Sequence, residues 1–204
     1  MSQIIFDMDD LERQLKVLSV KHRIAFAASC CERLLPNYRA FSRMENWGKP
    51  EVLSLAVDEI WNSILTLSLS QSRLKELKTE CDKVIPDTED FSTIYTSAAL
   101  DAGTAVTTTL DCYLTGEPRL AAEVASIARD TVDMFVQDHN NMNYSDPGFE
   151  QQILNNPLMV AELEKQRSDL TELLRTSELS AEFLTGIRAS SYNNGVSNIG
   201  VSSS

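Results

Sequence analysis

Apolar residues recur every three or four positions in nearly every segment of this chain of 204 residues. This spacing places them on one face of an α-helix, whereas a half-buried strand needs an apolar residue at every second position. Strand-like alternation is almost absent before the C-terminal tail. The pattern therefore predicts an all-α protein.

Glycine and proline mark the predicted helix boundaries. Gly-x-Pro segments at 48–50 and 116–118 each combine a residue suited to a helix end with one suited to a first helical turn. Asp-Pro at 146–147 and Asn-Pro at 156–157 predict two further starts, each with a side-chain acceptor at the N-cap. The predicted helices span about residues 9–17, 19–46, 50–69, 71–84, 92–115, 118–139, 157–175 and 178–190, with a short turn of helix near Phe149.

No repeat and no shift in composition divides residues 1–190. We therefore expect one compact bundle of about seven to eight helices in a single domain. Residues 191–204 form a tail rich in Ser, Asn and Gly, which is typical of a frayed terminus. Because Val196, Ile199 and Val201 are apolar, this tail could instead lie partly packed on the bundle, and the sequence leaves both states open.

The charge balance limits the expected partners. The chain carries 30 acidic and 18 basic residues, a formal net charge of −12, which argues against binding to a phosphate backbone. No segment contains the roughly 18 uncharged apolar residues that a membrane span requires. The N-terminal sequence also lacks the regions of an export signal. We expect a cytoplasmic protein with neither a nucleic-acid nor a membrane partner.

The cysteines and histidines lack the spacing of a metal or redox site. The four cysteines contain no Cys-x-x-Cys motif, and His22 and His139 are isolated. Cys30 and Cys31 are neighbours on a predicted helix, so they are expected to pack as small apolar side chains in a reducing compartment. Neither a nucleophile–base pair nor a phosphate-binding loop is recognisable. The sequence predicts no metal, no cofactor and no catalytic residue.

The predicted helix at 19–46 carries charges among apolar residues. On a helical projection Glu32 borders the main apolar face, while Arg33 lies on the far side with Phe26 and Asn37. Because burial of the Phe26 side chain is favourable, we expect this far side to be covered as well. The helix would then be central, and Arg33 and Asn37 would need buried polar partners.

A proline lies inside the same predicted helix. Pro36 has no N–H to donate to the carbonyl of Glu32, and its ring pushes against that carbonyl, so a kink is expected there. The kink would be flanked by a small polar niche that includes Tyr38. Trp61, on the predicted helix at 50–69, could line a pocket beside it, although aromatic residues at helical spacing usually belong to the core.

The predicted helix at 92–115 offers a partner for Arg33. Asp101 shares a face with apolar and small residues, so its carboxylate is expected to point into a covered region. Small residues nearby would let another helix approach closely. We predict an ion pair between Arg33 and Asp101. The charged residues at 75–80 and 162–167 are predicted to form solvent-exposed helix faces.

Four segments resemble a bacterial family catalogued as domain of unknown function 416. They are AFAASCCERLLPNYRAF at 25–41, EIW with Trp61, SAALDAGTAV at 97–106 and GVSNIGV at 195–201. The resemblance covers nearly the whole chain in order. It implies an all-α fold of this length in a bacterial cytoplasm and a C-terminal segment that belongs to the folded unit, and it supplies no catalytic residue.

Two functions remain open. The first is a non-catalytic interaction or structural module that binds a protein partner or itself; the acidic surface would favour a basic partner. The second is a small-molecule binder or enzyme that uses the polar niche at the kink. Its candidate residues are Glu32 as acid or base, Arg33 as anion anchor, Asn37 and Tyr38 as hydrogen-bonding groups, Asp101 as orienting group, and Trp61.

Overall fold

The computed structural model describes residues 6–202, and within that range the protein is all-α, as predicted. The helices are α1 (Met8–Lys16), α2 (Val20–Glu45), α3 (Pro50–Ser63), α4 (Gln71–Asp82), α5 (Thr96–Thr115), α6 (Pro118–His139), α7 (Phe149–Leu154), α8 (Pro157–Arg175) and α9 (Ala181–Tyr192), followed by the 3₁₀ turn η1 (Asn193–Gly195). Eight of the helices in the described range correspond to predicted helices. The additional one, α7, is the short turn of helix that the sequence indicated near Phe149.

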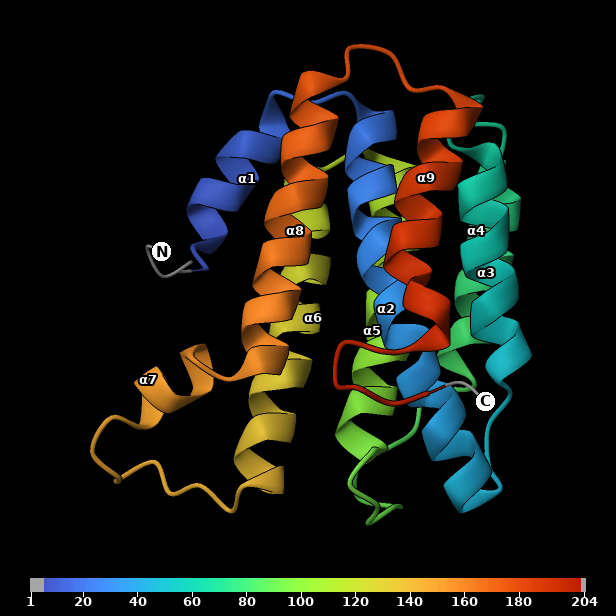
Figure 1. The fold of residues 1–204 in the computed structure, drawn as a ribbon. Helices are drawn as coiled ribbons and strands as arrows, with labels where there is room; N and C mark the ends of the chain where they lie inside the picture. Colours follow the sequence, from blue (N-terminus) through green and yellow to red (C-terminus); the bar gives the residue numbers. More distant parts are fainter. Residues whose placement is uncertain (1–5, 203–204) are drawn as a thin grey trace.

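Helix α2 is the centre of the bundle. It contacts α3, α5, α6, α8 and α9, which surround it in Figure 1. Every residue from 24 to 38 is buried, so α2 is covered on all sides along these turns. A helix without a polar face belongs in a core. The predicted second covered side is therefore confirmed. Pro36 lies inside α2, which continues beyond it to Glu45.

Three consecutive side chains at the start of α2 hold the loops at that end of the bundle. Because neighbouring residues on a helix point about 100° apart, Lys21, His22 and Arg23 reach in different directions. They donate to the backbone carbonyls of Leu65, Thr176, Gly116, Leu15 and Lys16. These carbonyls lie at or just beyond the C-terminal ends of α1, α3, α5 and α8, where carbonyls lack intrahelical donors.

Some predicted boundaries were wrong. The helix expected to reach residue 69 ends at Ser63, and four residues later Leu67 has φ +50°, a left-handed conformation in which an α-helix cannot continue. The Ser63 carbonyl still accepts from Leu67 N at 2.7 Å, and Tyr113 Oη donates to the same carbonyl at 3.3 Å. α5 begins at Thr96 rather than 92, and residues 146–147 precede α7 in a turn. The N-cap at Asn156 is confirmed, because its Oδ1 accepts from Leu158 N at 3.0 Å.

Two glycines allow close approaches to the core. Gly48 has φ +82°, and a Cβ there would lie 2.3 Å from Tyr38 Oη, so this turn requires glycine for both conformation and space. Gly103 is helical, and a Cβ there would lie 2.5 Å from Ile85 Cγ1. The small residues of α5 thus also make room for a side chain from the loop before that helix.

The described part of the tail packs on the bundle. Ile199 is 3% exposed and joins a cluster of apolar side chains from α5, α6, α7 and α8. Asn198 is buried, and its backbone N–H donates to the carbonyl of Arg33 at 3.1 Å. A backbone bond from Ser197 N to the Val201 carbonyl at 2.8 Å closes the segment into a turn. The tail therefore covers α2 next to Pro36.

No helix within residues 6–202 is both long enough and apolar enough to cross a membrane.

Candidate functional site

Arg33 is the centre of a buried ionic network, but its partner is not Asp101. Its Nε and Nη2 donate to the two carboxylate oxygens of Glu162 at 2.8 and 2.6 Å. Its Nη1 donates to the Ser29 carbonyl at 2.8 Å and lies 3.6 Å from Asp169 Oδ2. The predicted Arg33–Asp101 pair is therefore wrong. The covered side of α2 faces α8, which carries both acidic partners, whereas Asp101 bonds to α6.

The network is balanced in charge. Asp169 accepts from Ser29 Oγ at 3.0 Å and pairs with Lys165, so two cations face two carboxylates. Burial by itself would lower the pKa of Arg33, but the Glu162 and Asp169 carboxylates hold that pKa well above its usual range. The guanidinium therefore stays charged. A planar fork that bonds both oxygens of one carboxylate also fixes how α2 and α8 align.

The sequence interpretation of α8 missed these partners. Residues 162–167 were predicted to be solvent-exposed, yet the Glu162 side chain is 0% exposed. Glu162, Gln166 and Asp169 recur at helical spacing on the side of α8 that also buries Leu170. That spacing was the available signal, because it places three polar residues on a face shared with apolar ones.

Asp101 forms a separate polar site with α6. Thr131 Oγ1 lies 2.8 Å from Asp101 Oδ2 and 2.8 Å from the Ile127 carbonyl, although a hydroxyl has only one proton to donate. Burial raises the pKa of Asp101 to about 6, while the Thr131 bond opposes the rise. A protonated Asp101 would supply the second proton at this site.

We expect Asp101→Asn to increase the free energy of unfolding at pH 7.5 by about 1–2 kcal/mol, because it removes a carboxylate whose ionisation burial opposes. In the wild type this carboxyl binds a proton more tightly in the folded state, so its contribution to stability is lost as pH rises toward and through about 6. The gain should thus be largest above pH 6.5 and vanish near pH 4. Urea unfolding at several pH values measures it. Asp90→Asn, in an exposed loop, is the control and should change little.

A second ionic site lies on the α3–α9 side of α2. Arg188 of α9 donates through Nε to Glu32 Oε1 at 2.6 Å and pairs through Nη2 with Asp58. Its guanidinium carbon lies 6.0 Å from the centre of the Trp61 ring. Burial raises the pKa of Glu32, and the charge of Arg188 opposes that rise. Arg188 therefore brings together Glu32 and Trp61, two of the six candidate residues.

The remaining candidates point elsewhere. Asn37 Nδ2 donates to Asn198 Oδ1 of the tail at 3.0 Å. Tyr38 Oη donates to the Val84 carbonyl at 2.5 Å, and burial raises the pKa of this phenol. The six candidate residues therefore face five different surroundings, namely α8, α9, the tail, the loop after α4, and α6.

The surroundings of the cysteines make their thiols poorly reactive. All four are free and buried. Burial raises the pKa of Cys30 to about 11 and the pKa of Cys81 and Cys112 to about 12, so the reactive thiolate forms are scarce near neutral pH. In residues 6–202 no group of three or more His, Cys, Asp or Glu side chains is placed to hold a metal ion.

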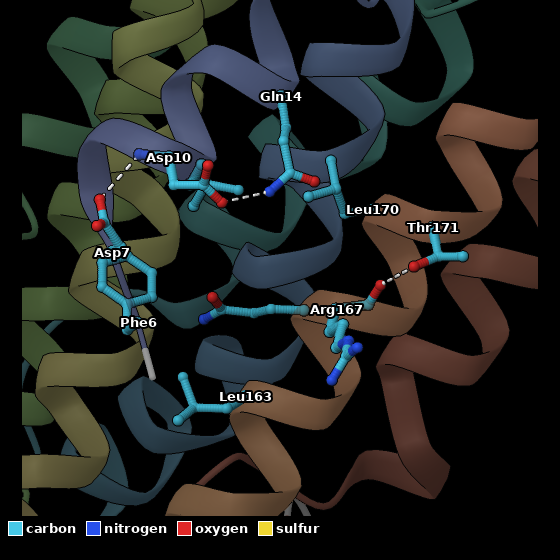
Figure 2. Close-up of a pocket in the computed structure, with 10 residues that line it drawn as sticks. Phe6, Asp7, Asp10, Gln14, Leu163, Arg167, Leu170 and Thr171 are labelled. Carbon is cyan, nitrogen blue, oxygen red and sulfur yellow. Dashed lines mark hydrogen bonds between the residues drawn. The ribbon is translucent and has the colours of Figure 1, made fainter. Parts of the chain in front are cut away.

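A groove lies between α1 and α8. Its volume is about 490 Å³, within the usual range of ligand pockets. Figure 2 shows its lining, with Asp7, Asp10 and Gln14 along α1, Leu163, Arg167, Leu170 and Thr171 along α8, and Phe6 between the helices. The wall formed by α1 is acidic, the wall formed by α8 carries one cation, and apolar side chains lie between them.

Comparison with known proteins places the chain in a family. Residues 10–202 match the family described as "Protein of unknown function (DUF416)". The chain belongs to the DUF416 family. The resemblance found in the four sequence segments is thereby confirmed.

DUF416 relatives occur in several bacteria. The chain is 27% identical to the uncharacterized protein YjaG of Escherichia coli strain K12, over 92% of this chain and 94% of the relative. It is 23% identical to an uncharacterized protein of Haemophilus influenzae, over 94% and 96%. A crystal structure of a DUF416 family protein from Shewanella baltica OS155 superposes with a TM-score of 0.86, at 27% identity, over 94% of this chain and 97% of that one.

Proposed function

We propose that this DUF416 protein is a non-catalytic binding protein whose α1–α8 groove holds a basic, amphipathic segment of another protein. The observation that carries the proposal is the lining of the groove, which combines acidic residues of α1, apolar side chains and the amide of Gln166. Gln166 is 5% exposed, and its Nε2 donates to the Ala125 carbonyl at 2.9 Å and to Glu162 Oε1 at 2.8 Å. Its Oε1 has no recorded donor among residues 6–202.

The shape of the groove suits a peptide. α1 and α8 both pack on α6, and the residues that line the groove come from α1, α8 and the segment just before α1. Lining residues recur over about two turns of each helix, which matches the length that a short helical segment presents to a groove. Apolar side chains of the partner would contact Phe6, Leu163 and Leu170.

Charge favours a basic occupant. Asp7 uses one carboxylate oxygen to cap Asp10 N at 2.9 Å, which leaves the other oxygen available to a ligand. Asp10 lies one turn further along the same wall, where its carboxylate accepts from Arg13 Nη2 at 2.9 Å and from Gln14 Nε2 at 2.7 Å, so a basic ligand would share Asp10 with Arg13. The net charge of −12 would also draw a basic segment toward the protein from a distance. Arg167 on the opposite wall has no recorded side-chain partner among the described residues, and it would accept an acidic group that sets the segment's direction.

The separation of the candidate niche residues supports a binding role over an enzymatic one. General acid–base chemistry needs a titratable group that can reach the substrate proton it transfers and a neighbouring group that orients it. Arg33 is committed to Glu162, and Asp101 bonds to Thr131 on a different helix. These charges hold helices together.

Fluorescence anisotropy with a labelled helical peptide of Leu and Lys, compared with a Leu and Glu peptide of the same pattern, tests the proposal. The basic peptide should bind at least tenfold more tightly than the acidic one. Asp7→Asn combined with Asp10→Asn should weaken it at least tenfold, since Asn preserves the helix cap while the charge is lost.

The matched control is Asp9→Asn on the same helix, because Asp9 faces Arg119 and does not line the groove. It should leave the affinity unchanged. Equal binding of both peptides, or equal weakening by the control, would refute the proposal. Light scattering tests whether a second copy of the chain occupies the groove. A dimer that dissociates in the Asp7/Asp10 double variant would show this, and the proposal of a basic segment from another protein would then be wrong.

A further inference from the structure

A second cavity lies on the opposite side of α2 from the Arg33 network. It has a volume of about 300 Å³ between α2, α3 and α9, and the polar side chains that line it include Glu32, Arg39, Ser54, Asp58, Arg188 and Tyr192. Arg188 and Thr185 also line a neighbouring cavity of about 220 Å³ beside Trp61. Two arginines therefore face one cavity on a protein whose net charge is −12.

Arg39 makes no direct ion pair in the described range, although its charge acts on the Glu32 carboxylate and opposes the rise that burial causes in the pKa of that group. Its Nη2 donates to Ser54 Oγ at 3.1 Å. The remaining N–H groups of its guanidinium are free to bind a ligand. A planar guanidinium with several donors matches the oxygens of carboxylate and phosphate groups.

Arg188 has two ion-pair partners that differ in burial. Its partner Glu32 has a side chain only 4% exposed and lies on the central helix, so that carboxylate cannot move away from Arg188. Its partner Asp58 has a side chain 51% exposed, and ion pairs at such exposure contribute little. The Asp58 carboxylate can therefore leave Arg188 while Glu32 keeps the guanidinium in place.

We infer that this cavity binds a small oxyanion, a carboxylate or phosphate group, which bridges Arg39 and Arg188 and displaces Asp58. Two arginines and two carboxylates line the cavity, and movement of the Asp58 carboxylate toward solvent would leave both guanidinium groups facing the ligand. The hydroxyls of Ser54 and Tyr192 line the same space and can donate to its oxygens. This site is independent of the α1–α8 groove and of the function proposed for it.

Trp61 reports on the site because its ring lies beside Arg188. Trp47→Phe removes the second of the two tryptophans and leaves Trp61 as the only source of indole fluorescence. Titration with sodium phosphate and with sodium succinate, each against sodium chloride at equal ionic strength, should give a saturable fluorescence change for at least one oxyanion and none for chloride. Isothermal titration calorimetry on the unmodified chain provides a second readout, and the oxyanion that binds identifies the class.

Two variants separate a binding site from a structural ion pair. Arg39→Gln should weaken oxyanion binding at least tenfold, whereas Asp58→Asn should tighten it about threefold or more because the competing carboxylate is gone. Arg167→Gln, an arginine in the other groove, is the control and should change nothing. Unfolding midpoints confirm that the variants fold. Absence of a saturable response in both assays, or weaker binding by Asp58→Asn, would overturn the inference.

Discussion

Glu162→Leu is expected to lower the free energy of unfolding by about 3–5 kcal/mol, since it leaves the buried Arg33 guanidinium without its main carboxylate. Two hydrogen bonds at 2.8 and 2.6 Å are lost, and water cannot replace them around a side chain that is 6% exposed. The remaining acid, Asp169, is 3.6 Å away and already pairs with Lys165. Urea unfolding followed by circular dichroism measures the loss.

A double-mutant cycle distinguishes this pair from the one predicted by sequence. Arg33→Met and Glu162→Leu together should cost much less than the sum of the single changes, with a coupling of about 2 kcal/mol or more. The cycle of Arg33→Met with Asp101→Asn should be additive, because Asp101 bonds to Thr131 instead. Glu164→Ala, at an exposed position of α8, is the control for substitutions on this helix. Additive effects for Arg33 and Glu162 would contradict the network.

Deleting residues 196–204 is expected to lower the free energy of unfolding by about 4 kcal/mol or more. The deletion removes the fully packed Ile199 side chain, worth roughly 1.5–3 kcal/mol of burial. It also removes Asn198, which bonds to the Arg33 carbonyl, to the Ala128 carbonyl at 2.8 Å and to Asn37 at 3.0 Å. Each such bond contributes about 1 kcal/mol, and Asn37 is left buried without its acceptor.

Point variants divide the effect of the deletion into its parts. Asn198→Ala keeps the backbone bond and should cost about 2 kcal/mol through its two side-chain bonds. Asn155→Ala removes an exposed amide at the end of α7 and should cost no more than about 0.5 kcal/mol. Thermal and urea unfolding give both values. If the tail deletion lowered the free energy of unfolding no more than Asn155→Ala does, the tail would not stabilise the bundle and the prediction would be wrong.

The helices could be predicted because their signals are local. The extended apolar pattern of residues 24–38 indicated a central helix, and every residue in that range is buried. The start of α8 followed from Asn156 and Pro157 for the same reason, since a cap depends on residues two or three positions away. The end of α3 was not predicted, because Leu67 takes a left-handed conformation at φ +50° that its residue type does not favour. The Tyr113 hydroxyl, 50 positions from Ser63, donates to the carbonyl at this end of α3.

The candidate site could be predicted only in part. Two polar residues on α2, Glu32 and Arg33, were singled out because charges on a buried helix need partners, and both have them. The sequence did not indicate which residues are their partners. Glu162 and Arg188 lie 129 and 156 positions away in the chain, and each follows a spacing that is equally compatible with a solvated helix face.

The sequence by itself determined that this chain forms helices around a covered, proline-containing one and that charges would be buried there. This follows from periodicity and from the chemistry of single residues, which act over a few positions. The tertiary structure alone decided that α8 supplies the carboxylates for Arg33, that α9 supplies the cation for Glu32, and that the tail bonds to α2. A buried charge is stabilised by whichever opposite charge packing brings within about 3 Å, and packing depends on all the helices together.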